Sequence, residues 1–150
     1  MTADEVRSFL SQIYPIRLEI EAKKRALLMI NKLDKESSYM LHDNPMLSQK
    51  HFDRVRECST LIEHMKAELN DSIYQLNDRL NIALKMIELV PDPIKKTVLM
   101  QHFYDGECAD RVANKIGYSI QSVWRIIRFE CDRIAFTMPE DLVPEEYLQH

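Results

Sequence analysis

Val112-Ala113-Asn114-Lys115-Ile116-Gly117-Tyr118-Ser119 joins two segments of helical apolar spacing. Gly117 can adopt the positive φ that a tight turn between helices needs, and Ser119 is a preferred residue for the start of the next helix. Apolar or small residues recur at helical spacing on both sides of this turn, namely Val112, Ala113, Ile116, Val123 and Ile126. The pattern therefore predicts two short helices that cross at a steep angle over a small shared core, which is a helix-turn-helix.

A sharp boundary lies upstream, at Val90-Pro91-Asp92-Pro93. Pro91 ends the preceding helix, Asp92 can cap the next one, and a proline at the first helical position loses no hydrogen bond. One unit is therefore predicted over 91–136. Its expected elements are a helix over 93–104 with Ile94, Val98, Leu99 and Phe103 turned inward, a turn at Asp105-Gly106, a helix over 108–116, and a final helix over 119–136.

The N-terminal segment has the apolar periodicity of helices, and the whole chain is predicted to be all-α. Thr2 and Glu5 fit a capping box that opens the first helical segment. Pro15 disfavours the α conformation of the residue before it and is expected to break or kink the helix there. The first long helix is expected to end near Asp34, before a loop that the composition of 37–45 indicates.

A second long helix is predicted over 48–89, because apolar residues recur there at spacings of three and four. At about 1.5 Å per residue it would be about 60 Å long, and its apolar seam needs a partner. That partner is either the first helix, folded back as an antiparallel hairpin, or a second copy of the chain. Residues 1–90 are thus predicted to form a long, coiled-coil-like helical hairpin that serves dimerisation or partner binding.

Charge is unevenly distributed along the chain. The net charge is −4, yet residues 91–136 carry 7 basic and 6 acidic side chains, whereas residues 137–150 carry 4 acidic side chains and no lysine or arginine. An anionic partner is therefore expected to bind residues 91–136. The acidic tail, 137–150, is predicted either to be mobile or to lie over the basic helix and compete with its partner.

The composition excludes several classes of function. Two glycines cannot build a glycine-rich phosphate loop. Three widely spaced cysteines form neither a disulfide framework nor a zinc knuckle, and the five histidines show no metal-ligand spacing. Because no nucleophile, base and orienting group can be grouped, we predict neither an enzyme nor a cofactor or metal site. The chain lacks a signal-peptide pattern and an apolar run near the roughly 20 residues of a membrane span, so a cytoplasmic protein without membrane contact is expected.

The exposed side of the final helix holds the candidate binding residues. Gln121, Ser122 and Arg125 lie near its start, on the side away from the core, where a recognition helix reaches base edges of double-stranded DNA. Glutamine can pair with adenine, and arginine with guanine, in bidentate fashion. Trp124 either contacts the DNA or covers the core of its own unit. Phosphate contacts are expected from four basic residues: Arg111, Lys115, Arg128 and Arg133.

Four stretches of the C-terminal unit carry a family resemblance: Leu89-Val90-Pro91-Asp92-Pro93, Leu99-Met100-Gln101-His102-Phe103-Tyr104-Asp105-Gly106, Val112-Ala113-Asn114-Lys115-Ile116-Gly117-Tyr118-Ser119 and Val123-Trp124-Arg125-Ile126. They resemble DNA-binding region 4 of bacterial sigma factors. More specifically, they are similar to phage and prophage regulators of the ArpU and RinA type, in which a long N-terminal helical segment precedes such a module. The resemblance implies a transcriptional regulator, often of late phage genes.

Two positions depart from the pattern of that family. Cys108 stands where a serine or threonine cap is usual, and a thiol is a poor acceptor, so the start of that helix is expected to fray. Ile120 stands early in the recognition helix, where a basic or polar residue is usual. DNA affinity or base choice is therefore expected to differ from that of relatives.

The sequence thus predicts a sequence-specific, DNA-binding transcriptional regulator that forms a homodimer or contacts RNA polymerase through its helical N-terminal region. One alternative is a small terminase subunit or another component of phage DNA packaging, which also combines a helix-turn-helix with an oligomerising helical region. The other is an interaction protein that does not bind DNA. Native mass separates the first two, because packaging rings contain many subunits.

Overall fold

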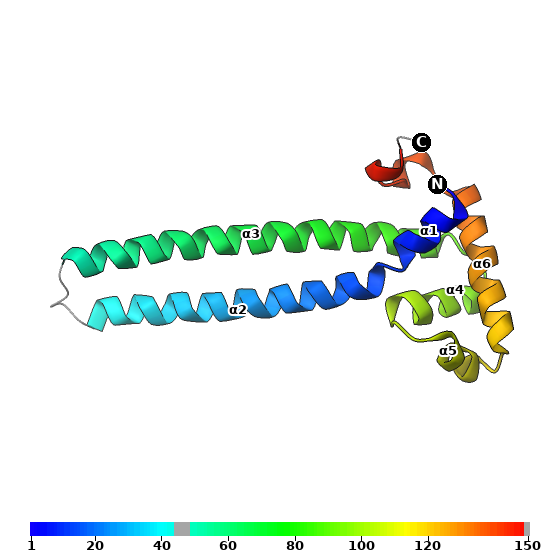
Figure 1. Cartoon of the computed structure of the whole chain (residues 1–150), viewed down its shortest axis with the longest axis horizontal. Coiled ribbons are helices and arrows are strands. Elements are labelled where there is room, and N and C mark those ends of the chain that lie inside the picture. The colour runs from blue at the N-terminus through cyan, green and yellow to red at the C-terminus, as the bar shows by residue number, and fades with distance from the viewer. Residues whose placement is uncertain (44–48, 149–150) are drawn as a thin grey trace. The chain divides into compact units, whose positions relative to one another are not determined.

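The computed structural model describes residues 1–43 and 49–148, the side chains of 37–43, 49, 51 and 52 aside (Figure 1). No strand occurs among these residues, which confirms the all-α prediction. In chain order the elements are α1 (Ala3–Leu10), α2 (Ile13–Asp43), α3 (Gln49–Glu88), α4 (Pro93–Leu99), the π-helix η1 (Met100–Tyr104), α5 (Ala109–Ile116), α6 (Ile120–Thr137), and the 3-10 helices η2 (Glu140–Leu142) and η3 (Glu145–Tyr147).

The chain divides into two compact units, which differ from the predicted domains. The hairpin unit comprises residues 18–77, and the core unit comprises residues 1–17 together with those from Asp78 onward. The predicted boundary near residue 90 therefore moves, because α1 and the last turns of α3 supply side chains to the same apolar core as α4 to α6. These fully buried side chains include Val6, Phe9 and Leu10 from α1, Met86 and Ile87 from the end of α3, and Val90 just after it.

In the hairpin unit, α2 and α3 run antiparallel and side by side (Figure 1). Lys66 Nζ lies 2.8 Å from Asp34 Oδ2, and Lys23 donates a hydrogen bond to Ser72. Of the two partners predicted for the long helices, the structure thus contains the intramolecular one. Their seam is thin, because Ile20, at 6% exposed, is the only buried residue among those described between 18 and 77.

The N-terminus begins as predicted but breaks earlier than predicted. Thr2 Oγ1 accepts from the Glu5 amide at 3.2 Å, and Glu5 Oε2 accepts from the Thr2 amide at 2.8 Å, which is the expected capping box. The interruption lies at residues 11–12, between α1 and α2. Pro15 sits in the first turn of α2, where its missing amide has no intrahelical acceptor to lose.

The long helices differ from prediction mainly where α2 ends. It continues to Asp43 instead of ending near Asp34, because neither glycine nor proline occurs between Pro15 and Pro45. Residues 37–43 are therefore helical, and the rest of the predicted loop lies outside the described residues. α3 spans Gln49–Glu88, within one residue of the prediction at each end.

The segment predicted as one helix over 93–104 consists of α4 followed by η1. The Asp105 amide donates to the Met100 carbonyl at 3.0 Å, which is the five-residue step of a π-helix. Val98, Leu99 and Phe103 are buried as predicted. Ile94 is 49% exposed, contrary to prediction, because it lies about 90° around the helix from the direction midway between Val98 and Leu99.

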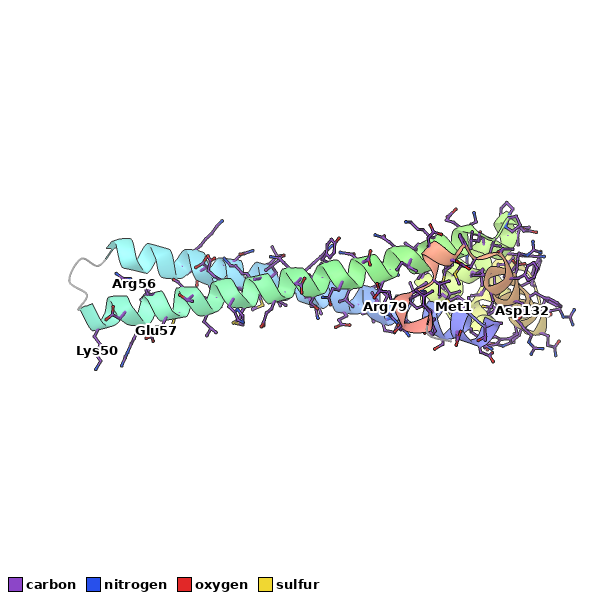
Figure 2. All side chains as sticks on the ribbon, turned by 90° about the horizontal axis from the view of Figure 1, so that it is seen from above. Met1, Lys50, Arg56, Glu57, Arg79 and Asp132 are labelled. Atoms are coloured by element: carbon purple, nitrogen blue, oxygen red, sulfur yellow. The ribbon has the colours of Figure 1, made fainter. Side chains whose placement is uncertain are left out.

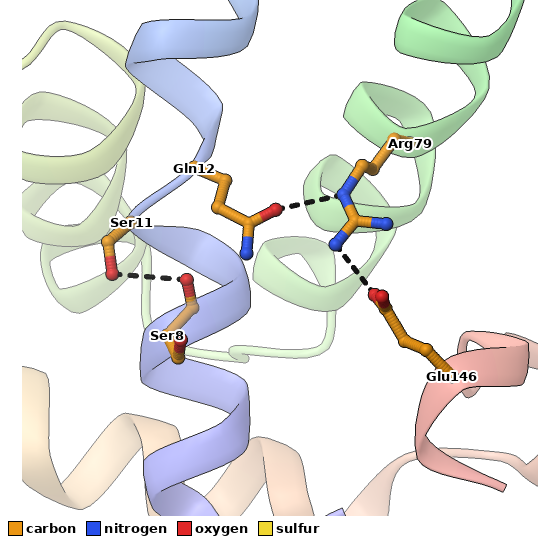
Figure 3. A network of polar contacts seen from close by, with 5 residues as sticks. All are labelled: Ser8, Ser11, Gln12, Arg79 and Glu146. Atoms are coloured by element: carbon orange, nitrogen blue, oxygen red, sulfur yellow. Dashed lines mark hydrogen bonds and ion pairs between the residues drawn. The ribbon is translucent and has the colours of Figure 1, made fainter.

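The acidic tail, as far as residue 148, packs on the core unit, which corrects both predictions for it. The rings of Tyr147 and Phe9 meet edge to face, with 6.3 Å between their centroids. Glu146 Oε1 accepts from Arg79 Nη2 at 2.6 Å, and Arg79 Nε donates to Gln12 Oε1 at 2.9 Å (Figure 3). The tail is therefore bound by contacts to α1 and α3 and leaves the basic face of α6 uncovered.

Candidate functional site

One face of α6 fixes this helix in the core unit. Val123, Ile127 and Ile134 are fully buried where α6 packs against α1, α4 and α5. At its start, Ser119 Oγ accepts from the Ser122 amide at 3.1 Å, so the predicted cap is present. Gly117 has a φ of +79°, as predicted for the preceding turn. Ile127 takes the fully buried place expected of Ile126, which is half-buried at the edge of the core.

The opposite face of α6 carries two of the predicted base-reading residues, Gln121 and Arg125, and one predicted phosphate contact, Arg128. Gln121, Arg125 and Arg128 are all exposed, and their spacing of three or four residues aligns them along one side of the helix. Within the described part of the chain, the side chains of Arg125 and Arg128 form no hydrogen bond or ion pair. Together with Trp124 and Phe129, these three residues line a shallow hollow of about 480 Å³.

Ser122 and Trp124 flank this row but already have protein contacts. Ser122 is half-buried, and its hydroxyl accepts from Ser119 Oγ at 2.8 Å. The indole of Trp124 meets the His102 ring edge to face, with 5.5 Å between centroids, and Arg7 Cζ lies 5.4 Å from the indole centroid. Trp124 is still 40% exposed. It therefore covers part of its own unit and also presents apolar surface to the hollow.

Two of the four predicted phosphate contacts are engaged in ion pairs. Lys115 pairs with Glu107, and Arg133 Nε lies 3.3 Å from Glu130 Oε2. Arg111 is exposed, and no partner of its side chain occurs among the described residues. The basic side chains of Lys115 and Arg133 are about half exposed, but their carboxylate partners are 15% and 1% exposed. Exchanging either carboxylate for a phosphate would therefore cost the free energy of leaving a largely buried charge without its partner.

Sequence reasoning missed a charged cluster between α4 and α6. Glu130 is only 1% exposed, and its Oε1 lies 3.7 Å from Lys95 Nζ. A hollow of about 530 Å³ opens beside it, lined by Lys95, Ser122, Arg125, Ile126, Phe129, Glu130 and Arg133. The burial of Glu130 had a signal in the sequence, because it falls at helical spacing between Ile127 and Ile134. The approach of Lys95 had none, since it depends on how α4 crosses α6.

The contacts of α1 and η1 with the site were also not foreseen. His102 Nδ1 lies 2.9 Å from the Glu107 carbonyl oxygen, which orients the ring that meets Trp124. Arg7 reaches the other aromatic contact from α1, a helix that sequence reasoning assigned to the N-terminal domain. The Trp124 indole at the edge of the candidate site is thus positioned by His102, more than 20 residues away in the sequence, and by Arg7, more than 110 residues away.

One cysteine of the core unit has a thiol with a strongly shifted pKa. Cys131 is 2% exposed, and burial raises the pKa of its thiol to about 11, so it stays protonated near neutral pH. Among the residues that the structure describes, no three histidine, cysteine, aspartate or glutamate side chains group as metal ligands. What the arrangement offers chemically is a fixed helix with a row of hydrogen-bond donors.

No described helix has both the length and the apolar character required to span a lipid bilayer. Comparison of the chain with models of protein families, with curated proteins and with solved structures found no match. The residues themselves therefore carry the functional argument.

Proposed function

We propose that this chain is a sequence-specific transcriptional regulator that binds double-stranded DNA, with α5 and α6 as a helix-turn-helix and α6 as its recognition helix. One observation carries the proposal: Gln121, Arg125 and Arg128 are exposed in a row on a helix whose other face is locked in the core. A recognition helix needs both properties, because it must enter the major groove without losing its position on the protein.

The row has the chemistry for reading bases. Gln121 near the helix start suits adenine, and Arg125 one turn later suits guanine, each pair being worth about 1 to 3 kcal/mol of discrimination. Arg128 and Arg111 are free to neutralise phosphates. If Lys115 and Arg133 join them on DNA, two to four phosphate contacts give a slope of log affinity against log salt between about −2 and −4.

The regulatory role is supported by sequence resemblance to sigma factor region 4 and to phage and prophage regulators of the ArpU and RinA type. In this proposal the core unit reads a promoter or operator, and the hairpin unit contacts a protein partner such as RNA polymerase. The proposed activity is binding, not catalysis, and needs no cofactor.

Selection from random duplex DNA at two salt concentrations tests the proposal. We expect an enriched motif with adenine and guanine at fixed positions. The double variant Arg125→Ala/Arg128→Ala should then bind the selected duplex at least tenfold more weakly and with a shallower salt slope, because one base contact and one phosphate contact are lost.

Arg54→Ala/Arg56→Ala is the matched control, since it removes two exposed arginines from α3 (Figure 2 shows Arg56). This control should bind as the unchanged protein does. Equal binding by both double variants, or no enrichment of any sequence at either salt concentration, would overturn the proposal.

A further inference from the structure

The last three turns of α6 expose two phenylalanines. Phe129 is 62% exposed and Phe136 is 91% exposed. They are seven residues apart, so they lie on the same side of the helix, two turns from each other. Two aromatic rings on one helix face make an apolar strip that a partner could cover.

The residues between the two rings make this face complementary to itself. Asp132 and Arg133 are adjacent, oppositely charged and exposed (Figure 2 shows Asp132). Suppose two copies of α6 lie antiparallel about a two-fold axis that passes between these two residues. Phe129 then faces the partner's Phe136, and Asp132 faces the partner's Arg133. Both pairs occur twice, as a two-fold interface requires.

A receptor for the more exposed ring is present beside Phe129. The hollow of about 530 Å³ between α4 and α6 has Phe129 and Ile126 on its wall, with Lys95 and Arg133 at the same opening. In the antiparallel register, the partner's Phe136 reaches this hollow. Its ring would there contact apolar surface, and its face would meet cationic side chains, which aromatic faces attract.

We propose that the C-terminal half of α6, formed by Phe129, Asp132, Arg133 and Phe136, is a dimer contact that binds the same surface of a second copy. The contact is small, because the exposed parts of the four phenylalanines amount to about 450 to 750 Å² in all. That is below the usual size of a stable specific interface, so the dimer should be weak, readily reversible and dependent on protein concentration. The proposal does not rest on DNA binding, because the contact is tested without DNA, although Phe129 borders the hollow beside the DNA-facing row and Arg133 is also a predicted phosphate contact.

Sedimentation equilibrium of the full chain without DNA tests the contact. The unchanged protein should pass from monomer to dimer as concentration rises, whereas Phe129→Ser/Phe136→Ser should stay monomeric over the same range. Met29→Ser/Leu33→Ser is the matched control, because it removes two apolar side chains that are 68% and 56% exposed on α2. This control should dimerise normally.

A cross-link tests the register separately. In a Cys58→Ser/Cys108→Ser background, which leaves only the buried Cys131, Asp132→Cys places two thiols next to the two-fold axis. Mild oxidation should give a covalent dimer, and the same background with Ser8→Cys, an exposed position on α1, should not. A chain that stays monomeric at every concentration, a dimer that survives loss of both phenylalanines, or a larger closed ring would each overturn the proposal.

Discussion

The core unit and the hairpin unit bury their apolar side chains to very different extents. In the core unit, helices from both ends of the chain close around residues such as Phe9, Leu99 and Ile127, each 1% exposed or less. In the hairpin unit, two helices share one seam, and Leu28 and Tyr74 are 69% and 73% exposed. Surface ion pairs add little to such a seam. Resistance to unfolding is therefore expected to reside in the core unit, while the hairpin unit keeps apolar surface for a partner.

The largest expected effect on stability separates an isoleucine-to-alanine substitution in the core unit from the same substitution in the hairpin unit. Ile127→Ala should lower the free energy of unfolding by about 3 to 4 kcal/mol, because it leaves a cavity under α6. Ile62→Ala, at a half-buried position on α3, should lower it by about 1 kcal/mol. Urea denaturation followed by circular dichroism measures both. Equal losses would show that the seam of the hairpin unit is as well packed as the core.

A smaller effect separates two glycines of the core unit that share a backbone conformation. Gly106 and Gly117 have φ values of +72° and +79°, so alanine costs about 1 to 2 kcal/mol at either position. At Gly106 a Cβ would also lie 2.7 Å from the ring of Tyr14, whereas at Gly117 it would meet nothing within 4 Å.

Gly106→Ala should therefore be the more destabilising of the two, by about 1 kcal/mol or more, because the Tyr14 ring must move as well. Thermal denaturation of the two variants compares them directly. If Gly117→Ala had the lower melting temperature, the close contact of Gly106 with Tyr14 would not be what makes alanine costly in these turns.

Local signals in the sequence predicted the elements of this fold better than their grouping. Ser119 and Gly117 act within a few residues, and the cap and turn that they predict are present. The π-helix had no such signal. The contact of Tyr147 with Phe9 joins opposite ends of the chain, so no periodicity within one segment could indicate it.

The candidate site shows the same division. Helical spacing alone placed Gln121, Arg125 and Arg128 on the exposed side of α6, where they are found. The ion pairs of Lys115 and Arg133 depend on where neighbouring carboxylates fall in three dimensions. The sequence could predict these basic side chains as phosphate contacts, but not that each already pairs with a carboxylate.

The buried thiol of Cys131 is expected to make the stability of the core unit depend on pH. Cys131 keeps its proton until about pH 11 in the core, against 9.0 for an ordinary thiol. Between these values the unfolded chain releases a proton that the folded chain retains. The free energy of unfolding should therefore be unaffected by the ionisation of this group below pH 9 and fall by about 2 kcal/mol as the pH rises towards 11. Tyr147, whose pKa burial also raises, acts in the same direction.

Urea denaturation across this pH range measures the loss, and Cys131→Ala should flatten the profile even though its starting stability is lower. Alkylation at pH 8 provides the comparison between units: exposed Cys58 should react rapidly in the folded protein, and Cys131 only after unfolding. Similar rates for the two thiols would mean that Cys131 is accessible to solvent in the folded protein, contrary to its burial.

The smallest expected effect concerns the two helix starts on either side of Gly117. Ser119 caps α6, whereas Cys108 at the start of α5 makes no side-chain hydrogen bond to the helix. Ser119→Ala should cost about 1 kcal/mol, and Cys108→Ser should add up to about 1 kcal/mol, because a hydroxyl can accept from the free amides of the first turn. Thermal denaturation measures both, and the two changes in one chain should nearly cancel. If the Cys108→Ser chain is no more stable than the original, solvent already satisfies those amides. The greater stability expected of the core unit would then come from side-chain burial and not from helix capping.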